Sequence, residues 1–599
     1  MDFYSWVEGR SREPVRGLYL NDLRLDEAFL NVSSQLNKSV WVYSQRQPCY
    51  KCTQFSLMGE LAAHNSTTYK VSSLFDLEML VLNQNLGDTF NLPENGTDHL
   101  ECSSNLSFGE FGIYDLVVSP ANSVTACRSE TVVPPVNIYL ALVVVTFMSL
   151  AGLLLLYGLY ILWNIYNERF LQKNARHLEC LDAENNSTLL EEIHNNNNTR
   201  NSSINKKDTK TVKFKTRLHS LDVFRGCCII PLVFYFGHKG GYFALEHVVW
   251  DGVPAAEWPF PCFLWIMSVC IPLKMKSDLA KKVPKSRLIF EITKRCVLLF
   301  ALGLMINSVD FGVQLETMRY YNVLQRIAVM YLISSILFAF LWPRDYKKFS
   351  GTYGDLRVLL PQWLIHLVIH AIYLGLVFLL PVPGCPTGYL GPGGLSEGGK
   401  YFNCTGGTHG YVDKLIHDEA HLLQASTTKD VYKFNAFEPV GPFSTLPSLL
   451  TVILGAQAGA ILVMHSDWHS RKLRLVIWGV GCIALGLTLH LNEIIPMNKH
   501  LWSTSFSLVT GGAAFLVLTV FMYLVDVTRI WNGFPLLQPG MNCLLLYVGS
   551  RITADMWPWH FAYGKMDTHF MKLIDSCWSV FIWVSISVYL YTKKVLLTA

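Results

Sequence analysis

Apolar stretches dominate the chain from residue 135 to residue 592, and eleven of them stand out. A bilayer core about 30 Å thick needs roughly 20 apolar residues per helix. The sequence therefore predicts a multi-pass α-helical membrane protein with about 11 transmembrane helices. The second, third and tenth stretches are short or interrupted. The predicted spans centre on Asn137–Trp163, Leu221–Phe236, Pro259–Leu273, Ile289–Ile306, Val323–Leu341, Val358–Leu380, Ser448–Met464, Leu475–Leu489, Ser505–Val525, Met541–Ala554 and Cys577–Tyr591.

Residues 1–134, ahead of the first span, predict a small β-rich domain. Runs such as Ser39–Tyr43, Thr67–Leu74 and Gly109–Val118 are rich in aromatic and branched residues and are separated by polar turns. A first transmembrane helix follows at 135–164. The polar, Asn-rich segment 165–217 predicts a disordered linker. Residues 218–599 then predict a ten-helix bundle with one long loop, 381–445. No repeat of fixed period is present, which argues against an inverted-repeat transporter.

Basic residues in the short loops predict the orientation. Clusters follow the third, fifth and seventh spans and the last one, which with eleven spans puts the C-terminus in the cytosol and residues 1–134 on the other, lumenal side. With 51% apolar residues and a net charge of only +4, the 599-residue chain does not resemble a soluble enzyme or a nucleic-acid-binding protein. Met1–Glu13 lacks the apolar core of a signal peptide.

Cysteines and glycosylation sequons agree with an oxidising lumenal compartment. Six cysteines on that side suggest three disulfides, with the connectivity open. Cys49-Tyr-Lys-Cys52 is also compatible with a redox motif or half a zinc site, but without a second CxxC a disulfide is favoured, and we expect no metal. The six cysteines are Cys49, Cys52, Cys102, Cys127, Cys385 and Cys404. The expected glycosylation sites are Asn31, Asn37, Asn65, Asn95, Asn105 and Asn403.

Candidate chemistry gathers at one predicted rim of the bundle. His247 stands between the second and third spans, in Glu246-His-Val-Val-Trp-Asp-Gly252, and can titrate near physiological pH. From spacing alone, packing at the interface is somewhat favoured over a reactive role. An ionisable residue at a membrane edge is nevertheless expensive unless it faces a cavity or a partner. Further residues expected on the same rim are Glu257, Gln325, Arg326, Asn498 and Lys499.

Several runs closely resemble one enzyme family over essentially the whole chain. They are SLDVFRG (220–226), HVVWDG (247–252), VLQR (323–326), PVPGCPTGYLGPGG (381–394), NCTGG (403–407), GAQAG (455–459), IPMNKHLWS (495–503) and PGMN (539–542). These runs resemble the heparan-α-glucosaminide N-acetyltransferase family of lysosomal membrane enzymes. A fourteen-residue run such as 381–394 makes chance agreement implausible.

The resemblance implies a lysosomal membrane enzyme that takes the acetyl group of cytosolic acetyl-CoA to the terminal glucosamine of heparan sulfate. A dimer is also implied, as is a catalytic histidine at the position of His247. That imidazole would either accept the acetyl group or deprotonate the amine. Glu257 would orient or charge-balance His247. Substrate binding would fall to Gln325, Arg326, Asn498, Lys499 and Trp502, and the CoA phosphates to Arg225, Lys294 and Arg295.

The chain departs from the family pattern near this histidine. Phe234–Gly237 lacks the usual Asn, Glu257 replaces an Asp, Val440 replaces an acid, and Ser550 stands where a His is common. A catalytically inactive or acceptor-altered relative, acting as a membrane scaffold, is therefore the alternative to an active enzyme. A transporter is less favoured.

Overall fold

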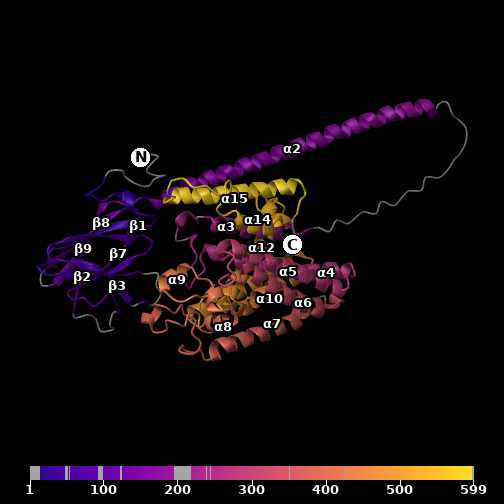
Figure 1. Ribbon diagram of the computed structural model, residues 1–599. Coiled ribbons are helices and arrows are strands. Elements are labelled where there is room, and N and C mark those ends of the chain that lie inside the picture. Colours follow the sequence, from indigo (N-terminus) through magenta and orange to yellow (C-terminus); the bar gives the residue numbers. More distant parts are fainter. Residues whose placement is uncertain are drawn as a thin grey trace. The chain divides into compact units, whose positions relative to one another are not determined.

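The computed structural model describes residues 14–46, 52, 54–91, 99–121, 124–193, 217–237, 239–242, 245–349, 351–424, 426–564 and 566–596. Two compact units make up the chain: Met1–Val145 together with Ser220–Ala599, and Thr146–His219. The first unit contains a β-sandwich and a helical bundle (Figure 1). Cys49 and Asn95 lie outside the described residues.

The N-terminal domain is a β-sandwich, as the alternating sequence runs predict. One sheet has the strand order β4-β1-β8-β9 and the other β6-β3-β2-β5-β7. All the pairings are antiparallel except β1 with β8. The strands are β1 Glu27–Ser34, β2 Val40–Arg46, β3 Gln54–Leu61, β4 Ser66–Ser72, β5 Leu77–Leu82, β6 Thr89–Asn91, β7 Leu100–Leu106, β8 Ile113–Ala121 and β9 Val124–Val133.

Branched aliphatic side chains from both sheets form the sandwich core. Leu30 and Val32 of β1 face Val42 of β2 and Val81 of β5, and all four are fully buried. In β1 the side chains alternate between the core and the outer face, because successive residues of a strand point to opposite sides. The Cys102–Cys127 disulfide joins β7 of one sheet to β9 of the other.

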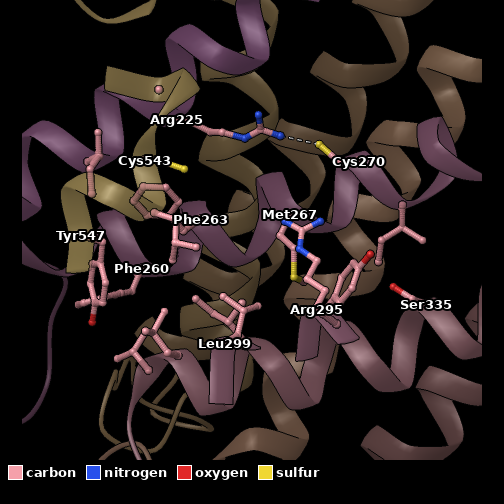
Figure 2. Close-up of a pocket in the computed structure, with 18 of the residues that line it drawn as sticks. Arg225, Phe260, Phe263, Met267, Cys270, Arg295, Leu299, Ser335, Cys543 and Tyr547 are labelled. Atoms are coloured by element: carbon pink, nitrogen blue, oxygen red, sulfur yellow. Dashed lines mark hydrogen bonds between the residues drawn. The ribbon is translucent and has the colours of Figure 1, made fainter. Parts of the chain in front are cut away.

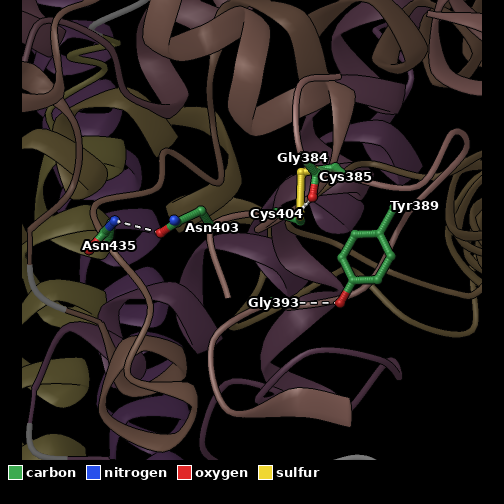
Figure 3. Close-up of a disulfide and its surroundings, with 7 residues drawn as sticks. All are labelled: Gly384, Cys385, Tyr389, Gly393, Asn403, Cys404 and Asn435. Atoms are coloured by element: carbon green, nitrogen blue, oxygen red, sulfur yellow. Dashed lines mark hydrogen bonds between the residues drawn. A yellow bond between two sulfur atoms is a disulfide. The ribbon is translucent and has the colours of Figure 1, made fainter. Parts of the chain in front are cut away.

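The disulfide predictions are confirmed as far as the described residues extend. Cys52 is disulfide-bonded. Cys385 and Cys404 close the start of the long loop after α7 (Figure 3). In the same loop the exposed sequon residue Asn403 accepts a hydrogen bond from Asn435 at 3.2 Å, and Tyr389 accepts one from the Gly393 N–H at 3.1 Å.

Every predicted span is helical, so the prediction of a multi-pass helical protein is confirmed. Nine helices among the described residues are long and apolar enough to cross a membrane. Of the other two, α5 is long but carries Glu291, Lys294 and Arg295, and α14 is short. The helices are α2 Ile138–Ile193, α3 His219–Phe236, α4 Pro259–Ala280, α5 Lys285–Phe311, α6 Val323–Leu341, α7 Gly354–Leu379, α8 Thr408–Ile416, α9 Thr427–Tyr432, α10 Pro442–Met464, α11 Trp468–Leu491, α12 Thr504–Phe521, α13 Leu537–Met541, α14 Cys543–Ile552 and α15 His569–Thr592.

Side-chain caps define where several of these helices begin. Ser503 accepts a hydrogen bond from the Phe506 N–H at the start of α12, and Asp467 accepts one from the Ser470 N–H at the start of α11. Such caps satisfy backbone N–H groups that have no partner inside the helix.

Helix α10 is the most buried of the candidate membrane-spanning helices in the described residues, with 94% of its most apolar stretch buried inside the protein. It packs closely on α4 through glycine. A Cβ atom at Gly455 would lie 2.3 Å from the Trp265 carbonyl oxygen, and one at Gly459 would lie 2.4 Å from the Val269 carbonyl oxygen. Small residues let helix backbones approach in this way inside membranes. The contact fixes α4, whose first turn follows Glu257.

The structure differs from the predicted disordered linker over residues 165–193, because α2 continues to Ile193. The run from Arg169 to Ile193 is rich in Leu and Glu, which favour helix even without an apolar face. Residues 194–216 lie outside the described residues.

Candidate active site

His247 and Glu257 meet in the loop between α3 and α4. His247 Nδ1 lies 3.0 Å from Glu257 Oε1, and the Val248 N–H donates to the same oxygen at 3.2 Å. The Glu257 side chain is fully buried, whereas that of His247 is 36% exposed. Because a carboxylate only accepts, Nδ1 carries the imidazole proton and Nε2 holds the free lone pair. Among the described residues none hydrogen-bonds Nε2.

Lys499 completes a cluster of three side chains. Its Nζ forms an ion pair with Glu257 Oε2 and lies 3.4 Å from His247 Nδ1. The nearby ammonium, and then burial, lower the pKa of His247 below its usual value, against the opposing effect of Glu257. The cluster therefore favours a neutral imidazole.

The loop that carries His247 is held by the segment before α12. Asn498 Nδ2 donates to the Trp250 carbonyl at 2.9 Å and to Asp251 Oδ1 at 3.2 Å, and its Oδ1 accepts from the Leu501 N–H. His500 stacks on Trp250 with ring centroids 5.4 Å apart. Asn498 thus positions the histidine loop with both ends of its amide. His500, which adjoins Lys499, was not among the residues expected from the sequence.

A cavity of about 460 Å³ lies between α3, α4, α5, α6 and the α13–α14 segment (Figure 2). Its walls are mostly apolar. At one end of α4 lies Phe260, and toward the other end lie Cys270 and Lys274. Lys274 lies fourteen positions after Phe260, which corresponds to about 21 Å at the helical rise of 1.5 Å per residue.

Basic side chains line part of this cavity. Arg225 pairs with Asp222 at 2.8 Å and donates to Cys270 Sγ at 2.8 Å (Figure 2). The Arg295 guanidinium lies 4.9 Å from the ring centre of Tyr331. Lys294 is exposed on another face of α5 and is not part of the lining. The structure therefore brings together Arg225 and Arg295 but not Lys294.

Phe260 connects the cavity to the histidine cluster. Its ring lines the cavity, and Lys499 Nζ lies 5.9 Å from the ring centre. Since Glu257 pairs with that same lysine, the histidine cluster stands next to the Phe260 end of the cavity. The arrangement suits a long ligand whose reactive end reaches Phe260.

Arg326 belongs to a second, buried polar cluster. It donates to Ser444 Oγ and stacks over Trp502 at 4.8 Å. Nearby, Asp413 Oδ1 accepts from the Phe443 N–H at 2.8 Å, while its buried Oδ2 accepts no hydrogen bond from the described residues. Burial raises the pKa of Asp413 to about 7. No sequence motif pointed to Asp413, which lies in the long loop 381–445.

Gln325 has a capping role. Its Oε1 accepts from the Asn322 N–H at 2.9 Å, and its Nε2 donates to the Tyr320 carbonyl at 3.1 Å, in a capping box at the start of α6. Both the oxygen and the nitrogen of the Gln325 side-chain amide are therefore hydrogen-bonded within the protein.

Of the altered positions, only Glu257 contacts His247 in the described residues, and the others make local contacts elsewhere. Glu257 reaches the imidazole directly, and the Val440 N–H donates to Glu438 Oε1 at 3.1 Å. At Gly237 a Cβ atom would lie 3.2 Å from His560 Cε1, so the backbone there passes close to a buried histidine. Ser550 Oγ donates to the Tyr547 carbonyl.

Comparison with known proteins defines the class. No family model matches the chain, but two curated N-acetyltransferases match it along nearly its whole length, so this multi-helix membrane protein is an acyltransferase. The chain is 32% identical to the heparan-alpha-glucosaminide N-acetyltransferase of Mus musculus over 98% of its length and 91% of the relative's. Its identity to the same enzyme of Homo sapiens is 31%, over 96% and 88%. The chain belongs to the heparan-alpha-glucosaminide N-acetyltransferase family.

Proposed function

We propose that this protein transfers the acetyl group of cytosolic acetyl-CoA to the terminal glucosamine amine of heparan sulfate in the lysosomal lumen. The observation that carries the proposal is the His247–Glu257–Lys499 cluster beside the Phe260 end of a long, mostly apolar cavity that basic side chains line in part. The sandwich faces the lumen and the C-terminus faces the cytosol. A dimer is part of the same proposal.

The cavity holds the donor. Arg225, Arg295 and Lys274 pair with the phosphates of CoA, which suit charge-assisted hydrogen bonds. The apolar wall between them and Phe260 contacts the pantetheine arm. The thioester then lies beside Phe260, within reach of the histidine cluster.

Two routes use the same nitrogen. In the first, His247 Nε2 attacks the thioester carbonyl, the C–S bond breaks, and CoA leaves as its thiolate. The glucosamine amine then attacks the acetyl-imidazolium, and the amine proton ends on Nε2. In the second, Nε2 takes the proton from the ammonium and the amine attacks the thioester directly; the C–S bond breaks, and CoA leaves as its thiol with the remaining amine proton. In both, Glu257 holds Nδ1–H and so keeps Nε2 basic.

Lys499 adapts the site to an acidic compartment. Either route requires neutral imidazole, whereas an unperturbed histidine, with a pKa of about 6.5, is largely protonated in a lysosome. The lowered pKa of His247 supports the neutral form there. Arg326, Trp502 and Asn498 support the lumenal side, the first two by stacking and the third by holding the loop.

The test is transfer of labelled acetyl from acetyl-CoA to glucosamine by the detergent-purified full-length protein. The His247→Ala variant is expected to lose transfer and still bind acetyl-CoA. The matched control is His469→Ala, an exposed histidine at the start of α11. Label that survives denaturation on the intact protein, and is absent from His247→Ala, would select the acetyl-histidine route.

The missing Asn in Phe234–Gly237 and the missing acid at Val440 are the reason to test one alternative, a catalytically inactive relative. An inactive membrane scaffold would show neither transfer nor binding of acetyl-CoA, and that result would overturn the proposal. A transporter would move its cargo equally well with His247→Ala.

A further inference from the structure

A second histidine, outside the candidate active site, faces two carboxylates. His569 begins α15, Asp26 lies just before β1, and Glu110 lies just before β8. His569 Nε2 is 3.2 Å from Glu110 Oε2 and 3.5 Å from Asp26 Oδ1. The three ligand atoms all lie within 4.8 Å of one another. The cluster joins the sandwich to the bundle.

The histidine is prepared for a metal. Its Nδ1 lies 2.7 Å from the Gly240 carbonyl oxygen, which only accepts, so Nδ1 carries a proton and Nε2 is the ring nitrogen that faces the two carboxylates. The side chain is 4% exposed, and Nε2 makes no hydrogen bond of acceptable geometry with the described residues. Backbone carbonyls commonly fix metal-binding imidazoles in this way.

The surroundings hold the ring in place. Tyr242 stacks on His569 with centroids 4.3 Å apart, and its hydroxyl donates to the Ile138 carbonyl at 2.7 Å. Gly240 and Gly241 both have positive φ, at 73° and 74°. A Cβ atom at Gly241 would lie 3.3 Å from His569 Nδ1 and 2.5 Å from Leu25 Cδ2. The glycine pair therefore lets the backbone carbonyl reach the ring.

The two distances from His569 Nε2 fit a tetrahedral ion. Zinc bound at about 2.0–2.1 Å separates its ligand atoms by about 3.3 Å. The two distances from Nε2, 3.2 and 3.5 Å, lie on either side of that value. A cavity of about 50 Å³ lined by Glu110 and His569 adjoins the cluster and leaves room for water as a fourth ligand.

The charges also favour a divalent ion. Neither Asp26 nor Glu110 pairs with a lysine or arginine among the described residues, and Glu110 is 5% exposed. A protonated His569 would leave one net negative charge in the cluster, whereas neutral His569 with a divalent ion leaves none. A nitrogen and two carboxylates are typical ligands of zinc-like ions, while calcium and magnesium prefer oxygen ligands throughout.

We propose that Asp26, Glu110 and His569 form a divalent transition-metal site, with zinc as the best fit, that fastens the N-terminal sandwich to the helical bundle. The site is independent of acetyl transfer. Its three ligands come from distant parts of the chain, so the ion crosslinks them only in the folded protein and stabilises that state.

The experiment measures metal in the full-length, detergent-purified protein by inductively coupled plasma mass spectrometry after dialysis against zinc and then metal-free buffer. We expect one zinc ion per chain. His569→Ala and the isosteric Glu110→Gln should each weaken binding by at least about tenfold, as loss of a metal-site partner does. The control is His64→Ala, an exposed sandwich histidine whose Nε2 lies 2.6 Å from Asn37 Oδ1.

Thermal unfolding gives a second readout. A chelator should lower the Tm of the intact protein and of His64→Ala, but leave that of Glu110→Gln unchanged. If His569→Ala does not fold, the zinc content and the Tm of Glu110→Gln test the proposal instead. An intact protein that takes up no zinc and whose Tm ignores the chelator would overturn the proposal in favour of a plain ionic contact. Zinc retained equally by Glu110→Gln would overturn it as well.

Discussion

Glu257 Oε1 lies 3.0 Å from His247 Nδ1 while Glu257 Oε2 pairs with Lys499, so one fully buried carboxylate joins the imidazole to the ammonium. The first oxygen orients the ring and the second holds the charge that keeps the ring neutral. This relationship makes the roles of the three side chains separable by substitution.

Glu257→Gln should lower kcat for acetyl transfer by roughly a hundredfold or more, the range typical of a disrupted acid–base group. The amide no longer enforces a proton on Nδ1, so Nε2 loses its basicity. Steady-state kinetics with labelled acetyl-CoA provide the measurement. Glu257→Asp, which keeps the charge on a shorter side chain, should retain part of the activity. An unchanged kcat in Glu257→Gln would remove this residue from the mechanism.

Lys499→Gln should move the acid limb of the kcat/KM profile to higher pH. The ammonium of Lys499 is the largest cause of the lowered pKa of His247, so removing it raises that pKa. At a given acidic pH a smaller fraction of the imidazole is then neutral, and activity falls first at low pH. Lys499→Arg should keep the profile close to that of the intact protein. A Lys499→Gln profile that falls uniformly without shifting would contradict this account.

Arg295→Ala should raise the KM for acetyl-CoA, by roughly tenfold if one charge-assisted hydrogen bond of about 1.5–3 kcal/mol is lost. Its neighbour Lys294 is exposed and outside the cavity lining, so Lys294→Ala is a matched control and should leave the KM unchanged. Equal increases in the KM of the two variants would mean that the overall positive charge of this region, rather than contacts inside the cavity, attracts acetyl-CoA.

Gly455→Ala should destabilise the bundle by about 1–3 kcal/mol, the usual cost of overpacking. The added Cβ atom would meet the Trp265 carbonyl oxygen at 2.3 Å, where α10 and α4 touch. Gly481 in α11 has no neighbour within 4 Å of such a Cβ, so Gly481→Ala should be neutral or slightly stabilising. Unfolding temperatures in detergent compare the two, and equal temperatures would argue against the close helix contact.

The helices and the histidine cluster were predictable for the same reason. Apolar runs define the spans, and His247, Glu257 and Lys499 each lie in a short segment at an end of a span, so the predicted topology brings them to one rim. The roles of adjacent residues were harder to predict. Successive side chains point about 100° apart around a helix, so packing decides which of two neighbours faces the cavity. Arg295 lines it and Lys294 does not, while Gln325 caps α6.

The cluster of Asp26, Glu110 and His569 could not be predicted from the sequence. Metal sites are usually recognised by ligands at short, regular spacing, and here the ligands are separated by the sandwich and the whole bundle. The helical continuation of α2 was missed for another reason. Its sequence has no apolar periodicity, and only the helix propensity of individual residues marks it.

The glycine contact between α10 and α4 also bears on which acyl groups the enzyme accepts. Lys274 and Phe260 lie on the same helix, so α4 itself fixes their separation, and the glycine contact with α10 holds that helix in place. In the proposed binding mode, the arm of CoA ends where Phe260 meets the Lys499–Glu257 ion pair. In that binding mode an acyl group longer than acetyl would press on a buried charge pair, so we expect the ion pair at the end of the cavity to favour short acyl groups.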